Sequence, residues 1–259
     1  MARRPMMAAN WKMNKLLGES QEYVEVLLPR IGGAEGVDVA IFAPFTSLGE
    51  VVRLTRDTPV IAGAQDFFYE DSGAFTGEVS APMLEDVGAE AVIVGHSERR
   101  EIFGETDETV GRKAARAVSA GLLPVVCVGE TKEERDAGSM WEKVSGQVRT
   151  VFEHLDAGEV GGEAIVFAYE PVWAIGTGET ATPEDAQDAV GRIRGLLEEI
   201  GGEDFAQEVR ILYGGSIKPG NVDDIMAQRD VDGGLVGGAS LEAESFSALV
   251  TGASNASSD

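Results

Sequence analysis

A carboxylate, Glu170, follows a short apolar run and precedes a proline-stiffened segment that ends in glycines. The run before it, residues 164–169, is β-branched and aromatic and too short for a helix, which predicts a strand buried on both faces. Glu170 then lies at the carboxyl end of that strand. Pro171 and Gly176 to Gly178 follow, an arrangement that would place a general base under a movable lid over 171–178.

Other side chains suited to chemistry follow further apolar runs. Asn10 and Lys12 come after the first run, and His96 and Glu98 come after the fourth. With Glu170 they supply an acid/base, a cation and an imidazole. Taken alone, each has a simpler explanation, because a lysine after a strand is usually solvated and a histidine is often structural. Their shared position after a strand favours one site.

Glycine-rich turns follow the last two apolar runs, at Gly214-Gly215-Ser216 and Gly237-Gly238-Ala239-Ser240. Exposed backbone N–H groups there can bind an oxyanion, and a following helix N-terminus adds partial positive charge. Tight turns without a ligand are the alternative. A phosphate site after strands seven and eight is common in barrels.

Eight short apolar runs alternate with amphipathic stretches, and each run is expected to be a strand. The runs are Met6 to Ala9, Val37 to Phe42, Val60 to Ala64, Ala91 to Val94, Leu123 to Val128, Ile165 to Tyr169, Val209 to Tyr213 and Gly233 to Val236. Helical spacing appears between them, for example over 110–118 and over 186–197. Thr106, Ser139 and Thr182 are candidate helix caps. This period predicts a (β/α)8 barrel, with an open doubly wound sheet as the rival.

One domain over residues 1–259 is expected, since no internal linker divides the 259 residues. The small polar residues 251–259 are expected to fray. No stretch reaches the roughly 18 apolar residues of a membrane span, and no signal-peptide core follows Met1. Cys127, the single cysteine, lies in an apolar run, which predicts a buried thiol in a disulfide-free, cytoplasmic protein.

The charge is strongly acidic, with 45 acidic and 21 basic residues and a formal net charge of -24. Nucleic acid and anionic membranes are therefore improbable partners. The lysine-poor, acid-rich composition suits a salty cytoplasm, where a screening length of about 3 Å at 1 M salt relieves self-repulsion. Base composition favouring arginine explains it equally well.

Several other chemistries lack their residues. One cysteine and two distant histidines cannot build a thiolate or imidazole metal cage, and no lysine follows a glycine as in a P-loop. The G-x-G-x-x-A pattern at 176–181 is separated from its strand by five residues, so it lacks the dinucleotide turn. No G-x-S-x-G elbow is present. We therefore expect no metal and no cofactor.

The segments that carry these residues together resemble the triosephosphate isomerase family. They are Asn10-Trp11-Lys12-Met13-Asn14, Gly95-His96-Ser97-Glu98-Arg99-Arg100, Ala168 to Gly178, Tyr213-Gly214-Gly215-Ser216 and Val236 to Ser240. The resemblance covers nearly the whole chain in the right order. It implies a cofactor-free isomerase of glycolysis and gluconeogenesis that interconverts dihydroxyacetone phosphate and D-glyceraldehyde 3-phosphate.

The resemblance also implies a role for each residue. Glu170 would be the base that moves the proton, His96 would polarise the carbonyl, and Lys12 would stabilise the enediolate. Asn10 would orient and bind the substrate, and Glu98 would pair with Lys12 in the resting site. Backbone N–H groups would hold the phosphate at Gly176, Ser216, Gly237 and Gly238.

A homodimer is implied as well. Gln65 and residues 72–78 resemble a long loop that inserts into a neighbouring subunit and brings Thr76 near its active site. The alternative is an ordinary surface loop, although an exposed Phe75 would be unusual in a monomer. A tetramer stays open. The net charge departs from the usual family pattern and would repel a dianionic substrate at long range.

Two rivals to this reading differ at the site. Another phosphosugar barrel enzyme would share the glycine turns but needs different residues after strands one, four and six. A non-catalytic phosphate-binding barrel would tolerate the loss of Glu170 or His96, and both are present.

Overall fold

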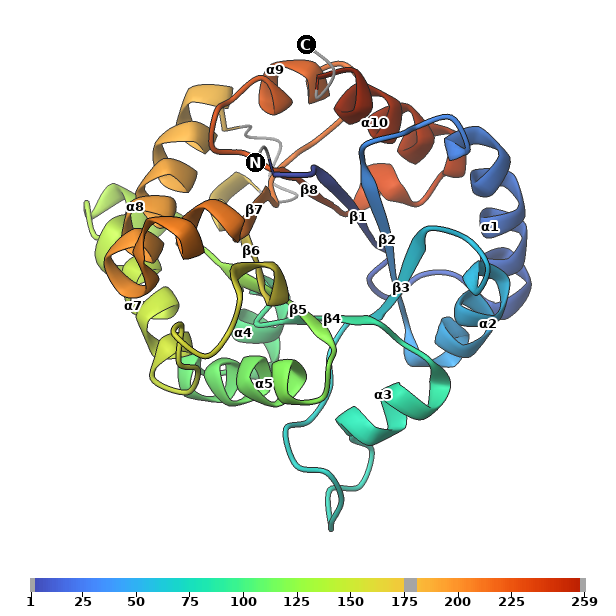
Figure 1. Ribbon diagram of the computed structural model, residues 1–259, viewed down its shortest axis with the longest axis horizontal. Coiled ribbons are helices and arrows are strands. Elements are labelled where there is room, and N and C mark those ends of the chain that lie inside the picture. The colour runs from blue at the N-terminus through green and yellow to red at the C-terminus, as the bar shows by residue number, and fades with distance from the viewer. Residues whose placement is uncertain (1–2, 175–180, 257–259) are drawn as a thin grey trace.

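Parallel strands close into a barrel with helices around it (Figure 1). The computed structural model describes residues 3–174 and 181–256, and in these residues eight strands pair in chain order. They are β1 (Met6–Asn10), β2 (Asp38–Ala43), β3 (Val60–Ala64), β4 (Ala91–Val94), β5 (Leu123–Val128), β6 (Val166–Tyr169), β7 (Arg210–Tyr213) and β8 (Gly233–Val236). Because β8 pairs with β1, the sheet has no edge, and the open-sheet rival is excluded.

The helices that follow the strands form the outer ring of the molecule (Figure 1). They are α1 (Leu17–Ile31), α2 (Phe45–Thr55), α3 (Ala81–Val87), α4 (Ser97–Phe103), α5 (Asp107–Ser119), α6 (Lys132–Asp136), α7 (Met140–Phe152), α8 (Pro183–Glu208), α9 (Val222–Met226) and α10 (Ala243–Ala256). Short 3-10 turns are η1 (Gly162–Ala164), η2 (Val172–Ala174) and η3 (Gly238–Ser240). Among the described helices, none combines the length and apolarity that a membrane span requires.

Each predicted strand is present, and its bounds lie within one residue of the apolar run. The expected caps are confirmed at Thr106 and Thr182, whose hydroxyls accept hydrogen bonds from the N–H groups of Thr109 and Asp185. Ser139 occupies the N-cap position of α7, as expected, but its side chain makes no cap hydrogen bond. Its hydroxyl donates instead to the carbonyl oxygen of Glu134, which closes the end of α6.

Residues 251–256 do not fray but continue α10, so this expectation was wrong. Gly252 and Ala253 are buried against the core, and the hydroxyl of Thr251 donates to the carbonyl oxygen of Ser247. Ser254 donates to the carbonyl oxygen of Glu35. Tertiary contacts therefore hold a sequence whose local composition is weakly helical. Residues 257–259 lie outside the described residues.

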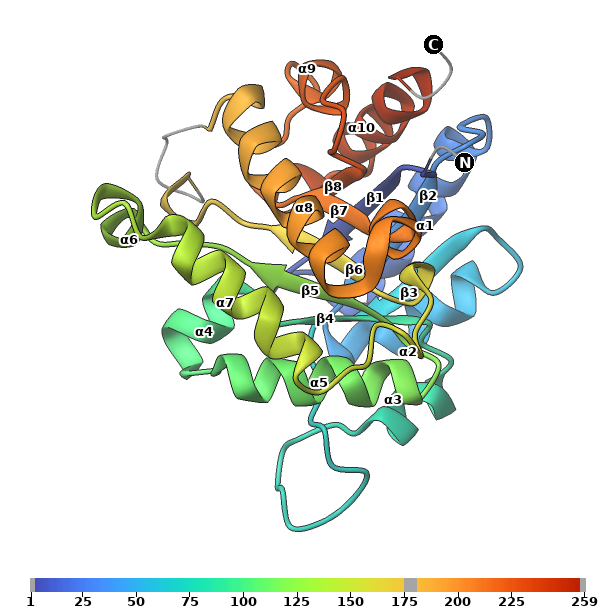
Figure 2. The same cartoon turned by 60° about the vertical axis from the view of Figure 1, so that its left-hand side comes forward.

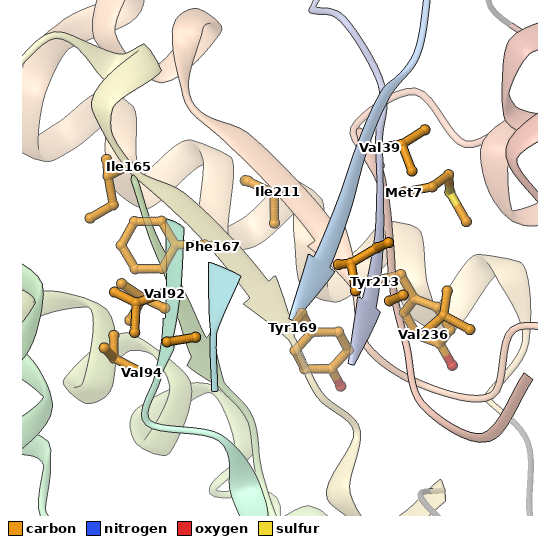
Figure 3. Close-up of a cluster of buried hydrophobic side chains, with 14 of the residues drawn as sticks. Met7, Val39, Val92, Val94, Ile165, Phe167, Tyr169, Ile211, Tyr213 and Val236 are labelled. Carbon is orange, nitrogen blue, oxygen red and sulfur yellow. The ribbon is translucent and has the colours of Figure 1, made fainter. Parts of the chain in front are cut away.

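Two apolar layers follow from the period-two alternation of the strands. The outer layer packs the strands against the helices, and Figure 3 shows part of it, including Phe167 and Tyr169 of β6. The inner layer consists of strand residues and fills the barrel, with members such as Ala8 of β1 and Ala168 of β6. Two residues further along the same inward-facing rows stand Asn10 and Glu170. The alternation that packs the core therefore points both polar side chains into the mouth of the barrel.

The connection from β3 to α3 projects well away from the body of the molecule (Figures 1 and 2). We call residues 65–79 the projecting loop. Most of its side chains are exposed, including Phe75 and Thr76.

Candidate active site

Glu170 is held at the end of β6 with almost no exposure to solvent (2%). The backbone N–H of Ser97 donates to its Oε2 at 2.9 Å, and its Oε1 lies 3.1 Å from Nε2 of His96. A Cβ atom on Gly214 would lie 2.8 Å from Cγ of Glu170, so the glycine after β7 makes room for the carboxylate. Glu170 is thus a buried carboxylate with two neighbours, Ser97 and His96, from the turn after β4.

His96 begins helix α4 as its cap residue. Its Nδ1 accepts a hydrogen bond of 3.2 Å from the backbone N–H of Glu98. Because an accepting ring nitrogen carries no proton, this contact assigns the proton to Nε2 and leaves the imidazole neutral. The Nε2–H group then faces Glu170, with its donor directed into the site.

Lys12 adopts a left-handed backbone conformation, with φ of 53°, which is unfavourable for a residue with a side chain. Oδ1 of Asn10 accepts the backbone N–H of Lys12 at 3.0 Å and stabilises this turn. The Lys12 ammonium lies 2.7 Å from Oε1 of Glu98, so the two form an ion pair. Asn10 therefore sets the direction in which the amine leaves the chain.

These groups line one cavity of about 300 Å³ at the carboxyl ends of the strands. Asn10, Lys12, His96 and Glu170 share it with the glycine-rich turns, which contribute Gly214, Gly215, Ser216, Gly237 and Gly238. A Cβ atom at position 237 would lie 3.2 Å from Cε of Lys12. Glycine at that position lets the backbone approach the amine closely. Gly176 lies outside the described residues, as do the other lid residues from Ile175 to Gly178.

A buried carboxylate that the sequence analysis missed, Glu130, lies beneath the start of the predicted lid. Its Oε1 accepts hydrogen bonds from the hydroxyl of Tyr169 at 3.1 Å and from Nε1 of Trp173 at 2.9 Å. Arg135 contacts the same oxygen at 3.2 Å and stacks over the Trp173 ring at 4.5 Å. Burial, together with the Glu130 carboxylate, raises the pKa of Tyr169. Glu130 also follows a strand end, β5, and this signal could have identified it.

The residues expected to meet a second subunit, Gln65, Phe75 and Thr76, do not line this cavity. Nε2 of Gln65 donates to the carbonyl oxygen of Phe42 at 2.9 Å, while Phe75 and Thr76 are on the projecting loop. Gln65 lines a second cavity of about 280 Å³, which shares Asn10, Lys12 and His96 with the first. Thr76 lines neither cavity, so within one chain it is not part of the site.

The remaining predictions concern metals and the thiol. In residues 3–174 and 181–256, no group of three or more His, Cys, Asp or Glu side chains is arranged to hold a metal ion. Cys127 is buried in β5, as expected. Burial, with a contribution from the nearby Glu170 carboxylate, raises the pKa of its thiol well above the ordinary value, so the thiol is unreactive near neutral pH.

The residues that line the first cavity stand where strands end and loops begin. In (β/α)8-barrel enzymes this is where the active site lies. A buried carboxylate facing a neutral imidazole N–H, with an amine alongside, is suited to proton transfer next to a carbonyl. Glycine turns at the end of β7 and β8 suit an anionic group. The fold and the site thus define a barrel enzyme of the acid–base class.

Comparison with known proteins specifies this class further. A family model described as triosephosphate isomerase matches residues 5–253. Triosephosphate isomerase of Rubrobacter xylanophilus is 71% identical over 252 residues, which are 97% of this chain and 98% of that protein. Those of Roseiflexus castenholzii and Moorella thermoacetica are 52% and 51% identical over 248 residues, which cover 96% of this chain and 97% and 98% of those proteins. The chain belongs to the triosephosphate isomerase family.

Proposed function

We propose that the chain interconverts dihydroxyacetone phosphate and D-glyceraldehyde 3-phosphate by proton transfer through an enediolate, with Glu170, His96 and Lys12 as the catalytic groups. Family membership supports the reaction. The observation that carries the assignment of residues is the convergence of the carboxylate, the imidazole Nε2 and the ammonium on one cavity.

Glu170 removes a proton from the carbon next to the carbonyl and returns it to the neighbouring carbon. Such a proton is weakly acidic, so the base needs a site with little water, and burial at 2% exposure supports this. The Nε2–H of His96 donates to the substrate oxygen on which negative charge develops. The old carbonyl oxygen must also gain a proton and the neighbouring hydroxyl oxygen must lose one; Nε2 of His96 gives its proton to the first and regains one from the second, so the cycle balances without a cofactor.

Lys12 stabilises the enediolate by its positive charge, and Glu98 holds the ammonium in the resting site at 2.7 Å. Asn10 supports Lys12 through the hydrogen bond to its backbone and takes part in binding the substrate. Ser216, Gly237 and Gly238 bind the phosphate through their N–H groups, and their position in the cavity supports this.

The segment 171–178 closes over the bound substrate, and Gly176 contributes a further N–H to the phosphate. Its described part supports a defined hinge, because Trp173, two residues after Pro171, contacts both Glu130 and Arg135. Closure excludes water, which would otherwise favour loss of phosphate from the enediolate.

A coupled assay that follows glyceraldehyde 3-phosphate tests the function, run at low salt and in molar KCl. We expect turnover without added metal or cofactor, together with a rise in KM at low salt because the acidic protein repels its dianionic substrate. No isomerisation at any salt concentration, by a protein shown to be folded, would overturn the proposal.

The chain further forms a homodimer through the face beside the second cavity. Large apolar side chains gather there with considerable exposure: Met13 is 96% exposed, Phe45 45% and Phe103 68%. A monomer rarely exposes such a patch. The projecting loop of a second copy fits the role of occupant, because Phe75 at its tip is also exposed.

With one buried cysteine and no disulfide possible within a chain, a cytoplasmic location completes the proposal.

A further inference from the structure

The projecting loop is folded upon itself through contacts within its own chain. The N–H of Phe68 donates to the carbonyl oxygen of Val79 at 2.8 Å, which closes the base of the loop. The Phe68 ring packs against Phe75 with ring centroids 4.5 Å apart. Gly73 permits this fold, since its φ is 146° and a Cβ there would lie 2.7 Å from the Phe75 ring.

One face of α5 contacts the first part of the projecting loop, residues 66–71, which we call the arm. The guanidinium of Arg112 lies 3.8 Å from the centroid of the Tyr69 ring and 3.3 Å from Oε1 of Glu70. One helical turn later, Nε of Arg116 lies 2.6 Å from Oδ1 of Asp71. Positions 112 and 116 are neighbours on a helix surface, so both arginines meet the same arm.

The root of this arm is fixed more firmly, by ion pairs to the buried Asp66. Lys113 of α5 lies 2.6 Å from Oδ1 of Asp66, and Arg99 of α4 lies 2.9 Å from Oδ2 of the same residue. Lys113 also pairs with Glu105. Pairs exposed to water contribute little individually, so the stacked Arg112 and the buried Lys113 supply most of the restraint.

The net charge of the chain opposes association of two copies, and the contacts with α5 reduce that repulsion. Two copies with a formal net charge of -24 each repel one another, and the arm itself carries Asp66, Glu70 and Asp71. Arg112 and Arg116 neutralise two of these carboxylates at the place where the loop would meet a partner. A prefolded loop also avoids the entropy cost of ordering its side chains on association.

We infer that Arg112, Lys113 and Arg116 of α5 form a clamp that holds the projecting loop in its binding shape in the separate protomer, so that a second copy of this chain meets a rigid loop. This inference rests on the proposed homodimer. It assigns to α5 a role in assembly that is separate from catalysis.

Subunit exchange between isotopically light and heavy protein, followed by native mass spectrometry, measures how the clamp affects dimer dissociation. We expect Arg112→Ala to raise the exchange rate by roughly tenfold, because each dimer loses the restraint twice. Arg192→Ala is the matched control. It removes the same charge and a similar stack, 4.4 Å from the Trp141 ring, away from the loop, and should change the rate less than about twofold.

A double-mutant cycle identifies the contact itself. Tyr69→Phe keeps the ring and should exchange like the wild type, whereas Tyr69→Ala should weaken the dimer and add little in the Arg112→Ala background. Additive effects, or equal effects of Arg112→Ala and Arg192→Ala, would overturn the clamp.

The N–H of Glu78 donates to the carbonyl oxygen of Phe75 at 3.0 Å, within the loop. Hydrogen exchange of the Phe68 and Glu78 amides in the separate protomer therefore tests prefolding directly. Met13→Glu, which places a charge on the apolar face at a side chain that is 96% exposed, supplies this protomer if the wild type is dimeric. Both amides should be protected, with protection falling about tenfold on Arg112→Ala. Unprotected amides before the mutation overturn the inference. A wild type that stays monomeric at high concentration refutes the homodimer instead. The hydrogen-exchange experiment on that monomer then still decides whether the clamp exists.

Discussion

The backbone N–H of Ser97 donates a hydrogen bond of 2.9 Å to Oε2 of Glu170, and this bond holds the proposed base at the wall of the cavity. The same turn supplies His96, whose Nε2 lies 3.1 Å from the other carboxylate oxygen. A single turn at the end of β4 thus contacts both oxygens of the proposed base.

Replacing Glu170 by Gln should abolish most of the turnover while substrate analogues still bind. A general base contributes about 10² to 10⁴ in rate, so we expect kcat to fall by at least that factor. The amide keeps the shape of the side chain and an acceptor for the Ser97 N–H. Steady-state kinetics together with the binding of inorganic phosphate would check this, and wild-type turnover would refute the assignment.

Replacing Asn10 by Ala should damage Lys12 indirectly. The substitution removes the side-chain oxygen that accepts the Lys12 N–H. This hydrogen bond offsets the cost of the positive φ at Lys12, which is on the order of 1 to 3 kcal/mol. We expect a loss of about 1 kcal/mol in unfolding free energy and a larger fall in kcat/KM. Asn14→Ala is a matched control, because Asn14 donates to the Trp11 carbonyl oxygen in the same segment without contacting Lys12. Equal kinetic losses in both variants would contradict this role for Asn10.

Alkaline pH should destabilise the fold through Tyr213. Burial raises the pKa of its phenol to about 12, with the Asp185 and Glu130 carboxylates adding to the effect. The unfolded chain loses this proton near pH 10 and the folded chain only near pH 12, so stability is intact below pH 10 and falls as the pH rises beyond it. By pH 11 the loss is on the order of 1 kcal/mol.

Tyr213→Phe isolates this contribution. Among the described residues the Tyr213 hydroxyl has no hydrogen-bond partner, so its removal should cost little at pH 7. Thermal unfolding from pH 7 to 11 should show a flatter decline for the variant, and parallel curves for variant and wild type would disprove the account.

Salt should raise the thermal midpoint if the acidic surface is an adaptation to a salty cytoplasm. With a formal net charge of -24, the folded state suffers self-repulsion that molar KCl screens. Calorimetry from low salt to molar KCl distinguishes the two explanations of the composition. A flat response would leave arginine-favouring base composition as the explanation.

The fold could be predicted from local pattern to a large extent. Short apolar runs separated by helical spacing located each strand within one residue, because strands buried on both faces must be apolar throughout. Local pattern placed Ser139 at the start of α7 but did not identify the partner of its hydroxyl. It failed at residues 251–256, where contacts with distant segments override the preferences of the chain. The position of Glu130 after β5 could be recognised from the sequence, but its contacts could not, because its partners Tyr169, Trp173 and Arg135 belong to three other elements.

The sequence by itself determined the alternation of strand and helix and the residue types that stand after each strand. Only the tertiary structure decided that the barrel closes, that His96 presents Nε2 rather than Nδ1 to Glu170, and that Asn10 supports the left-handed turn at Lys12. It also decided that α5 grips the projecting loop. The physical reason is that periodicity reports which face of an element is buried, whereas hydrogen-bond direction and charge pairing depend on which atoms other segments bring within about 3 Å.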